Sequence, residues 1–251
     1  MRATQTSTRP PRSVWLLELG IEPYDTILEL QRQLARSRQR GDISDGLIIL
    51  EHEPVITLGR RADESHVLAT RELLEQARIG VHRVERGGDV TYHGPGQIIG
   101  YPILRLADYR LGASDYMHRL EEVVIRVLAD LGLVGTRRER TIGVWLGNNK
   151  VAAFGARIGK GVTYHGFALN VCPNLEHYGL IIPCGITDGG VTSVEHELGR
   201  AVDISQVRQL VCNWFSELFH VSSQAVSRAQ LEQLATAEMS VGERLPLTGV
   251  R

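Results

Sequence analysis

Residues 150–170 read KVAAFGARIGKGVTYHGFALN, two largely apolar runs on either side of a glycine-containing turn. Runs of this kind predict neighbouring β-strands, which we place at Lys150–Ile158 and Val162–Leu169. A third short run, Val144–Leu146, precedes them and predicts another strand. This stretch therefore predicts a β-sheet at the centre of the fold.

Helices and further strands are expected on both sides of this stretch. Apolar residues at helical spacing predict helices over Tyr24–Arg40, Thr70–Ala77, Ser114–Leu131 (with Ser114 as N-cap) and Ile204–Phe219. Alternating or apolar runs predict strands at Val14–Leu19, Leu47–Leu50, Val81–Glu85 and Ile98–Leu104. Because β-α-β alternation is not regular, the pattern favours an α+β fold, a mixed β-sheet with packed helices.

The chain is expected to form one domain with two extensions. Its 251 residues, 43% of them hydrophobic, suffice for one substantial core, which we place over 13–220. Residues 1–12 are rich in Arg, Ser and Thr, as a transit peptide would be, but the Pro10-Pro11 pair favours a disordered tail. Residues 221–251 form a C-terminal extension of unknown role. No run approaches the ~18 apolar residues of a membrane span, so we expect a soluble protein without a membrane partner.

Charge and motif content exclude several classes of function. The 28 basic and 29 acidic side chains give a net charge of −1 without a basic block, which argues against nucleic acid as a partner. Three cysteines without a C-x-x-C motif favour a reducing, cytoplasmic setting and argue against a metal site. Gly94–Gly100 misses the dinucleotide-binding spacing, and the chain has no Walker, zincin or G-x-S-x-G motif.

Cys184 is the strongest candidate nucleophile. It lies between Pro183 and Gly185, in a stretch expected to be a long irregular loop over 171–192. Long loops are commonly functional, and glycine beside a nucleophile lets backbone N–H groups approach an oxyanion. Cys212 falls among apolar residues of a helix and Cys172 ends a strand, so both are expected to be structural. Local context alone leaves Cys184 as either a nucleophile or an inert loop cysteine.

A cysteine nucleophile needs a neighbour that favours its thiolate form. The candidates are Lys150, His93 and His165. Lysine occurs only at 150 and 160, while the other 26 basic residues are arginine. Lysine can lose its proton when desolvated and arginine effectively cannot, so Lys150 is either a functional amine or a solvated charge.

Arg86–Gln97 (RGGDVTYHGPGQ) holds five glycines or prolines in twelve residues. It is either a long turn or a backbone that passes close to a ligand, and we favour the second. The pentapeptide Val-Thr-Tyr-His-Gly occurs at 90–94 and again at 162–166, each copy offering a Tyr and a His at a turn. Because the flanking residues differ, this is not a domain repeat.

Four blocks in order resemble the lipoyl(octanoyl) transferases of lipoate biosynthesis. They are Glu51–Gly59 (EHEPVITLG), Arg86–Gln97, Lys150–Asn170, and Ile182–Gly185 with Val191–Ser193 (IPCG and VTS). The resemblance covers roughly residues 14–220. It implies the α+β catalytic module shared by lipoate and biotin protein ligases.

The resemblance also implies roles for residues. Cys184 matches the cysteine that carries the octanoyl group as a thioester, and Lys150 matches the lysine that lowers the pKa of that thiol and relays protons. His165 is expected to support the site. The segments expected to bind the substrate are Arg86, Gly87, Gly88, Asp89, Val90, Thr91, Tyr92 and His93; Ala153, Phe154 and Gly155; and Gly166, Phe167 and Ala168.

The implied reaction is the first step of endogenous protein lipoylation, octanoyl transfer from octanoyl-acyl carrier protein to a lipoyl-domain lysine. The implied acceptors are lipoyl domains of 2-oxoacid dehydrogenase acyltransferase subunits and the glycine cleavage H protein. No cofactor is expected, because a thioester is already activated. The alternatives are an ATP-dependent lipoate or biotin protein ligase, a Cys–His amidase-type hydrolase, and a noncatalytic lipoyl-domain binding module.

Overall fold

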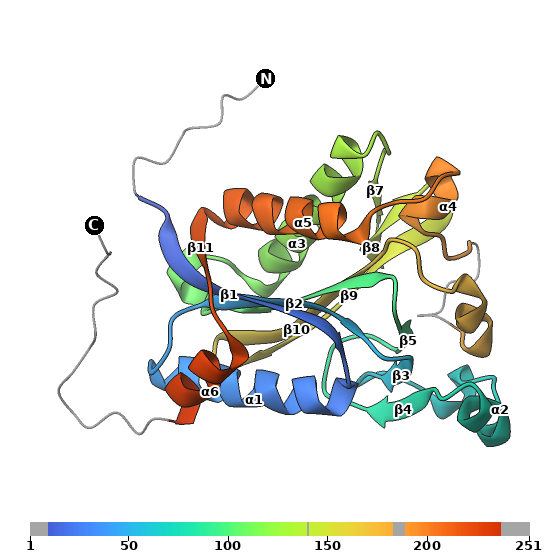
Figure 1. Ribbon diagram of the computed structural model, residues 1–251, viewed down its shortest axis with the longest axis horizontal. Helices are drawn as coiled ribbons and strands as arrows, with labels where there is room; N and C mark the ends of the chain where they lie inside the picture. The colour runs from blue at the N-terminus through green and yellow to red at the C-terminus, as the bar shows by residue number, and fades with distance from the viewer. Residues whose placement is uncertain (1–9, 140, 183–188, 237–251) are drawn as a thin grey trace.

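The main element of the fold is a mixed β-sheet (Figure 1). The structure, a computed structural model, describes residues 10–139, 141–182 and 189–236. Within these ranges the sheet has eight strands in the order β11-β1-β2-β6-β10-β9-β8-β7. The strands span Arg12–Glu22 (β1), Gly46–His52 (β2), Gln97–Ile103 (β6), Thr136–Arg138 (β7), Thr141–Leu146 (β8), Asn149–Gly159 (β9), Val162–Asn170 (β10) and Val221–Ala225 (β11).

A smaller sheet and the helices complete the domain. The small sheet has the order β4-β3-β5, with β3 at Val55–Leu58, β4 at Gly80–Arg83 and β5 at Val90–His93. The α-helices are Tyr24–Arg40 (α1), Arg71–Gln76 (α2), Ala113–Asp130 (α3), Val194–Leu198 (α4), Ile204–Phe219 (α5) and Arg228–Thr236 (α6). Short 3-10 turns occur at Glu64–His66 (η1), Leu106–Tyr109 (η2) and Leu175–Leu180 (η3).

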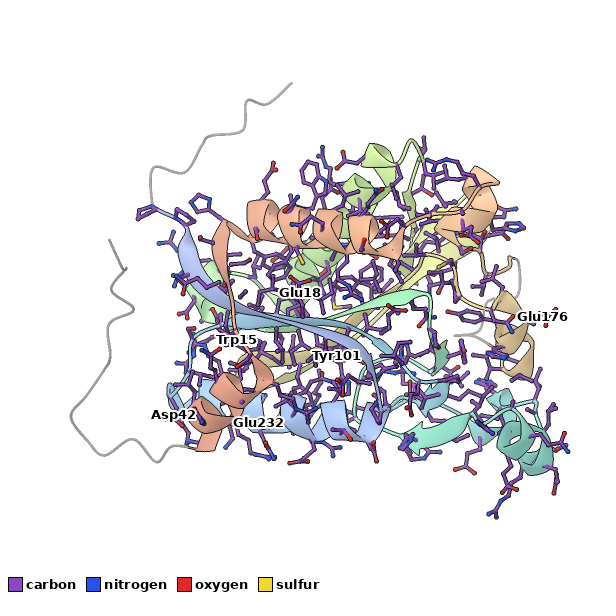
Figure 2. All side chains as sticks on the ribbon, viewed as in Figure 1. Trp15, Glu18, Asp42, Tyr101, Glu176 and Glu232 are labelled. Atoms are coloured by element: carbon purple, nitrogen blue, oxygen red, sulfur yellow. The ribbon has the colours of Figure 1, made fainter. Side chains whose placement is uncertain are left out.

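The main sheet is covered on both faces, by α3 and α5 on one side and by α1 and α6 on the other (Figure 1). Because side chains alternate along a strand, apolar residues of β2 serve both layers: Leu47 and Ile49 pack toward α3 and α5, and Ile48 packs toward α1. Figure 2 shows Trp15 and Tyr101 in the layer beside α1. Burial on both faces explains the nearly continuous apolar runs of the central strands.

The predicted α+β fold with a mixed sheet is confirmed. β1 runs parallel to both β2 and β11, whereas the pairs from β2 through β6, β10, β9 and β8 to β7 are antiparallel. Among the described residues, no helix is long and apolar enough to cross a membrane.

The helices α1 and α5 have the bounds predicted from the sequence. α1 ends at Gly41, whose φ of 95° is left-handed and whose N–H donates to the Ser37 carbonyl at 3.0 Å. The predicted N-cap of α3 is wrong by two residues. Gly112 occupies that position, and its N–H donates to the Asp115 carboxylate at 3.3 Å, so the helix begins before Ser114.

Some strands were not predicted from the sequence. They include β3 and, within the glycine-rich segment expected to pass close to a ligand, β5. The described part of the C-terminal extension belongs to the fold, because β11 pairs with β1 and Leu231 of α6 is fully buried against the α1 layer. Position 220 is therefore not an edge of the folded domain. Residues 1–9 and 237–251 lie outside the described residues.

Candidate active site

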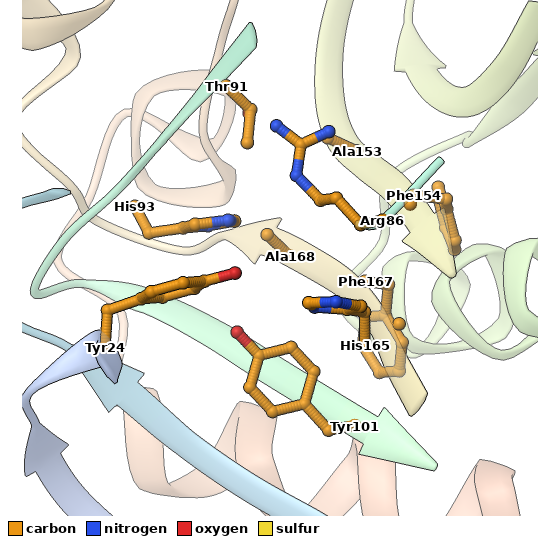
Figure 3. A pocket seen from close by; sticks show the side chains of 12 residues that line it. Tyr24, Arg86, Thr91, His93, Tyr101, Ala153, Phe154, His165, Phe167 and Ala168 are labelled. Atoms are coloured by element: carbon orange, nitrogen blue, oxygen red, sulfur yellow. The ribbon is translucent and has the colours of Figure 1, made fainter. Parts of the chain in front are cut away.

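A small, partly open cavity lies between the small sheet and the main sheet (Figure 3). Ten residues singled out from the sequence line it: Arg86, Thr91, His93, Ala153, Phe154, Gly155, His165, Gly166, Phe167 and Ala168. The structure thus brings together three segments that are far apart in the sequence.

The remaining predicted residues lie elsewhere, for a reason set by strand geometry. In β5, Thr91 and His93 face the cavity, so the alternating Val90 and Tyr92 point the other way, into the cluster beneath α2 and η3. The Tyr92 hydroxyl hydrogen-bonds His177 Nδ1 at 2.7 Å. Gly87, Gly88 and Asp89 line an open groove beside the cavity instead.

Sequence reasoning missed two tyrosines that line the cavity, Tyr24 and Tyr101. Figure 3 shows both hydroxyls turned toward the space between His93 and His165. Tyr24 begins α1 and Tyr101 lies in β6, and neither stands in an unusual local sequence. No local signal could have found them, because the packing of α1 and the place of β6 in the sheet bring them together.

Arg86 supplies a buried positive charge at one wall of the cavity. Its Nε donates to Thr57 Oγ1 at 3.0 Å and its Nη2 donates to the Thr57 carbonyl at 2.7 Å. Thr57 belongs to β3, so the small sheet holds the guanidinium in place. The side chain is 6% exposed.

The histidines around the cavity are neutral near pH 7. Burial lowers the pKa of His52 to about 4 and that of His165 to about 3, and burial likewise lowers the pKa of His93 well below its ordinary value. His52 Nε2 hydrogen-bonds the Tyr101 hydroxyl at 2.8 Å, and His93 Nδ1 hydrogen-bonds Gln97 Oε1 at 3.2 Å. These groups are suited to hydrogen bonding rather than to acting as strong bases.

His165 lies within β10, in the strand predicted at Val162–Leu169, rather than at the turn that the repeated pentapeptide suggested. Its φ is 54°, an uncommon value for a residue other than glycine, and its backbone N–H donates to Gln31 Oε1 of α1 at 2.8 Å. Its Nε2 is buried and has no hydrogen-bond partner among the described residues. Its ring lines the cavity, and the pairing of β10 with β6 begins two residues later, at Phe167.

Lys150 stands beside this cavity. It is 6% exposed, and its Nζ lies 5.3 Å from the centre of the Trp145 ring. A second, smaller cavity next to it is lined by Thr91, Lys150, Ala152, Ala153, Asn170, Tyr178 and Val191. Thr91 and Ala153 line both cavities, so the lysine amine adjoins the predicted substrate pocket.

Cys184 lies outside the described residues. The described chain on either side of it is fixed at two points. Ile182 N–H donates to the His66 carbonyl at 2.8 Å. On the other side, Lys150 N–H donates to the Gly190 carbonyl at 2.9 Å, and Thr192 N–H donates to the Lys150 carbonyl at 3.0 Å.

The other two cysteines are poor nucleophiles. Burial, together with Glu195 and Glu51, raises the pKa of the Cys172 thiol. Burial raises the pKa of Cys212 to about 12 in the core shared by α3 and α5. Since the thiolate is the reactive form, both are less reactive than a free cysteine.

The sequence blocks meet because backbone hydrogen bonds join them. Gly59 N–H donates to the Asp89 carbonyl at 3.1 Å, and Gly87 N–H donates to the Ala156 carbonyl at 3.1 Å. Gly96 N–H donates to the Glu51 carboxylate at 2.9 Å. Segments around 51–59, 86–97 and 150–170 therefore form one site. Within the described ranges, no three His, Cys, Asp or Glu side chains converge as a metal ion would require.

Solved structures similar to this fold include lipoate-protein ligases. Lipoate-protein ligase A bound with ATP superposes with a TM-score of 0.72 and 20% identity, covering 90% of this chain and 93% of that one. A putative lipoate protein ligase from Thermoplasma acidophilum with bound lipoic acid superposes with a TM-score of 0.69 and 20% identity, covering 90% of this chain and 93% of that one. At this identity the likeness shows the fold alone, which is that of a lipoate-protein ligase catalytic module.

Sequence comparisons place the chain more narrowly. The pattern of the lipoyl protein ligase A/B catalytic domain matches residues 23–216. The octanoyltransferase of Alkaliphilus metalliredigens is 46% identical over 206 residues, covering 82% of this chain and 94% of that one. The octanoyltransferase of Koribacter versatilis is 45% identical over 211 residues, covering 82% and 84%. The chain belongs to the lipoyl protein ligase A/B catalytic domain family and, within it, to the octanoyltransferases, which are acyltransferases.

Proposed function

We propose that this acyltransferase moves an octanoyl group from octanoyl-acyl carrier protein to the lysine of a lipoyl domain, through a thioester on Cys184. The acceptors are lipoyl domains of 2-oxoacid dehydrogenase acyltransferase subunits and the glycine cleavage H protein. The observation that carries the proposal is the buried amine of Lys150 beside the pocket formed by Ala153–Gly155 and Gly166–Ala168.

Two observations support Cys184 as the nucleophile. The thiols of Cys172 and Cys212 have raised pKa values, which leaves them mostly protonated near pH 7. Val191 pairs with Lys150 in a β-bridge and follows Cys184 by seven residues, so the chain connection is short. Residues 190–192, which shortly follow Cys184, are thus hydrogen-bonded to the backbone of Lys150. Lys150 is the residue expected to exchange protons with Cys184.

In the first half-reaction, the Cys184 thiolate attacks the carbonyl carbon of the donor thioester. The tetrahedral intermediate collapses, its bond to the phosphopantetheine sulfur breaks, and the Lys150 ammonium gives that sulfur its proton. Backbone N–H groups of the glycine-rich loop hold the oxyanion, a contribution often worth about 3 kcal/mol per donor.

In the second half-reaction, the incoming lysine of the lipoyl domain loses one proton to solvent and enters as the neutral amine. Its nitrogen attacks the Cys184 thioester, the neutral Lys150 amine takes the second proton from that nitrogen, an amide bond forms, and the Cys184 thiolate is released. Lys150 ends as the ammonium with which the cycle began. ATP is not required, because a thioester is already activated.

We place the octanoyl chain in the cavity between the two sheets. The side chains that form its apolar wall are Ala153, Phe154, Phe167 and Ala168. Each methylene removed from water contributes about 0.8 kcal/mol, which is sufficient to retain a medium-length acyl chain.

Two alternatives have weaker support. A ligase would activate a free acid with ATP, so ATP-independent transfer from the carrier separates the two activities. A Cys–His hydrolase would need a histidine base near neutral pKa, and burial holds the pKa values of His93 and His165 far below that range.

Intact-mass spectrometry tests the proposal. Protein incubated with octanoyl-acyl carrier protein, without ATP, should gain one octanoyl group that maps to Cys184. The Cys184→Ser variant should gain none, whereas Cys172→Ser should still be acylated. An adduct on Cys172, or acylation that requires ATP, would show the proposal to be wrong.

A further inference from the structure

An open groove adjoins the acyl cavity, because Phe154 and Gly155 line both. Its lining also includes Lys150, which is buried. Three arginines complete the basic part of the lining: Arg60 and Arg61, which are exposed, and Arg157, which is partly buried. The groove therefore brings a buried lysine and exposed arginines to one surface.

The acidic side chains of the groove are already neutralised. Glu85 accepts from Arg32 Nε at 2.8 Å and from Arg32 Nη2 at 2.7 Å. Asp89 lies 2.7 Å from His66 Nδ1. Neither carboxylate is paired with one of the three groove arginines.

The three arginines differ in their partners, because the Arg157 side chain hydrogen-bonds that of Tyr164, whose hydroxyl donates to Glu85 Oε1 at 3.2 Å. Among the described residues, no carboxylate lies within ion-pair distance of Arg60, Arg61 or Arg157. The backbones of the first two are fixed, since Arg60 N–H donates to the Arg86 carbonyl at 3.1 Å and Arg61 N–H to the Gly88 carbonyl at 3.2 Å. In a chain of net charge −1, this is a local excess of positive charge at the entrance to the site.

We propose that Arg60, Arg61 and Arg157 bind the phosphodiester of the phosphopantetheine arm that delivers the octanoyl thioester, an assignment that rests on the proposed function. The arm carries a thioester at one end and a phosphodiester at the other, and the groove is lined both by the buried Lys150 and by arginines that form no ion pair with a described carboxylate. The planar guanidinium of arginine can donate two parallel hydrogen bonds to two oxygens of one phosphate. The acceptor lysine is cationic in solution, so the same charges disfavour its entry here.

The test compares donors with and without the phosphate. Initial rates are measured with octanoyl-acyl carrier protein and with octanoyl-pantetheine, which lacks the phosphate. For the double variant Arg60→Ala with Arg61→Ala, the ratio of kcat/KM for the carrier donor to that for octanoyl-pantetheine should fall about tenfold, mainly through KM. Octanoyl-coenzyme A, which keeps the arm but lacks the carrier protein, should show a fall of similar size.

Matched controls separate the local charge from the total charge. The double variant Arg36→Ala with Arg71→Ala removes the same charge from exposed ion pairs outside the groove and should leave the ratio within twofold of wild type. The wild-type ratio should also fall as salt rises, and the groove variant should respond less. Arg157→Gln provides an independent third variant, for which the ratio should fall in the same direction.

Two results would overturn the assignment: an unchanged donor ratio in the groove variant, or a rise confined to KM for the lipoyl domain, which would make the groove the path of the acceptor. Failure of the proposed function is distinguishable, because wild-type protein would then transfer no octanoyl group from the carrier at all.

Discussion

At the residue scale, Gly143 and Trp145 pack closely against the side chain of Lys150. A Cβ at position 143 would lie 2.7 Å from Lys150 Cε and 2.6 Å from the Trp145 ring, so only glycine leaves room there. The Glu121 carboxylate accepts from the Gly143 N–H at 2.8 Å and holds this glycine in place. Close packing at Gly143 therefore keeps the Lys150 amine over the Trp145 ring. The backbone of Lys150 is held by its β-bridge to Val191.

Lys150→Arg should lower kcat by at least about 100-fold while keeping the positive charge, because arginine cannot exchange its proton in the cycle. The measurement is steady-state octanoyl transfer from the carrier to a lipoyl domain. Lys160→Arg, at the chain's other lysine in the exposed β9–β10 turn, is the matched control and should be nearly normal. Near-normal turnover of Lys150→Arg would mean that the residue acts only through its charge.

At the element scale, the approach of β10 to β6 shapes the cavity. A Cβ on Gly166 would lie 2.1 Å from the Gly100 carbonyl oxygen, a backbone atom that cannot move without separating the strands. The glycine predicted from the sequence as a substrate contact therefore also allows close strand packing. His165, immediately before it, takes its positive φ where β10 leaves the ladder with β6.

Gly166→Ala should destabilise the protein by about 2 kcal/mol or more, because the strands must part to admit the methyl group. Gly20→Ala in β1 is the control, since a Cβ there meets nothing within 4 Å. Urea denaturation of the two variants and the wild type measures the difference. Equal stability of the two variants would show that β6 and β10 are not packed as closely as described.

At the scale of the whole molecule, the C-terminal segment closes the α1 side of the fold. β11 extends the sheet beyond β1, and Val226 N–H donates to the Leu16 carbonyl at 3.0 Å. α6 then places Leu231, 0% exposed, in the same layer as Trp15 and Tyr101. Residues 221–236 therefore contribute to the core that supports the cavity.

Leu231→Ala should lower the free energy of unfolding by about 2–4 kcal/mol, since it leaves a cavity in a closed apolar layer. Leu234→Ala, three residues further along the same helix and 49% exposed, should cost less than about 0.5 kcal/mol. Thermal or urea denaturation compares the two. Equal, small effects would mean that α6 is not part of the stable core.

The sequence by itself determined the elements with a strong local pattern and much of the candidate site. α1 and α5 were predicted with their observed bounds because a 3.6-residue apolar period and a terminal cap are local properties. Of the ten cavity residues identified, Arg86, His93 and His165 were singled out by their local sequence, whereas the others were identified through the resemblance to the lipoyl(octanoyl) transferases.

Only the tertiary structure decided which side chains meet. β5 is a four-residue strand in a glycine-rich segment and is too short to show a periodic pattern in the sequence. Because side chains alternate along the strand, Thr91 and His93 face the cavity while Val90 and Tyr92 point away from it. Tyr24 and Tyr101 join the site, and β11 joins the sheet, through strand pairing and packing. These contacts connect residues that are distant in the sequence, so their partners are set by the register of the sheet, which local patterns do not encode.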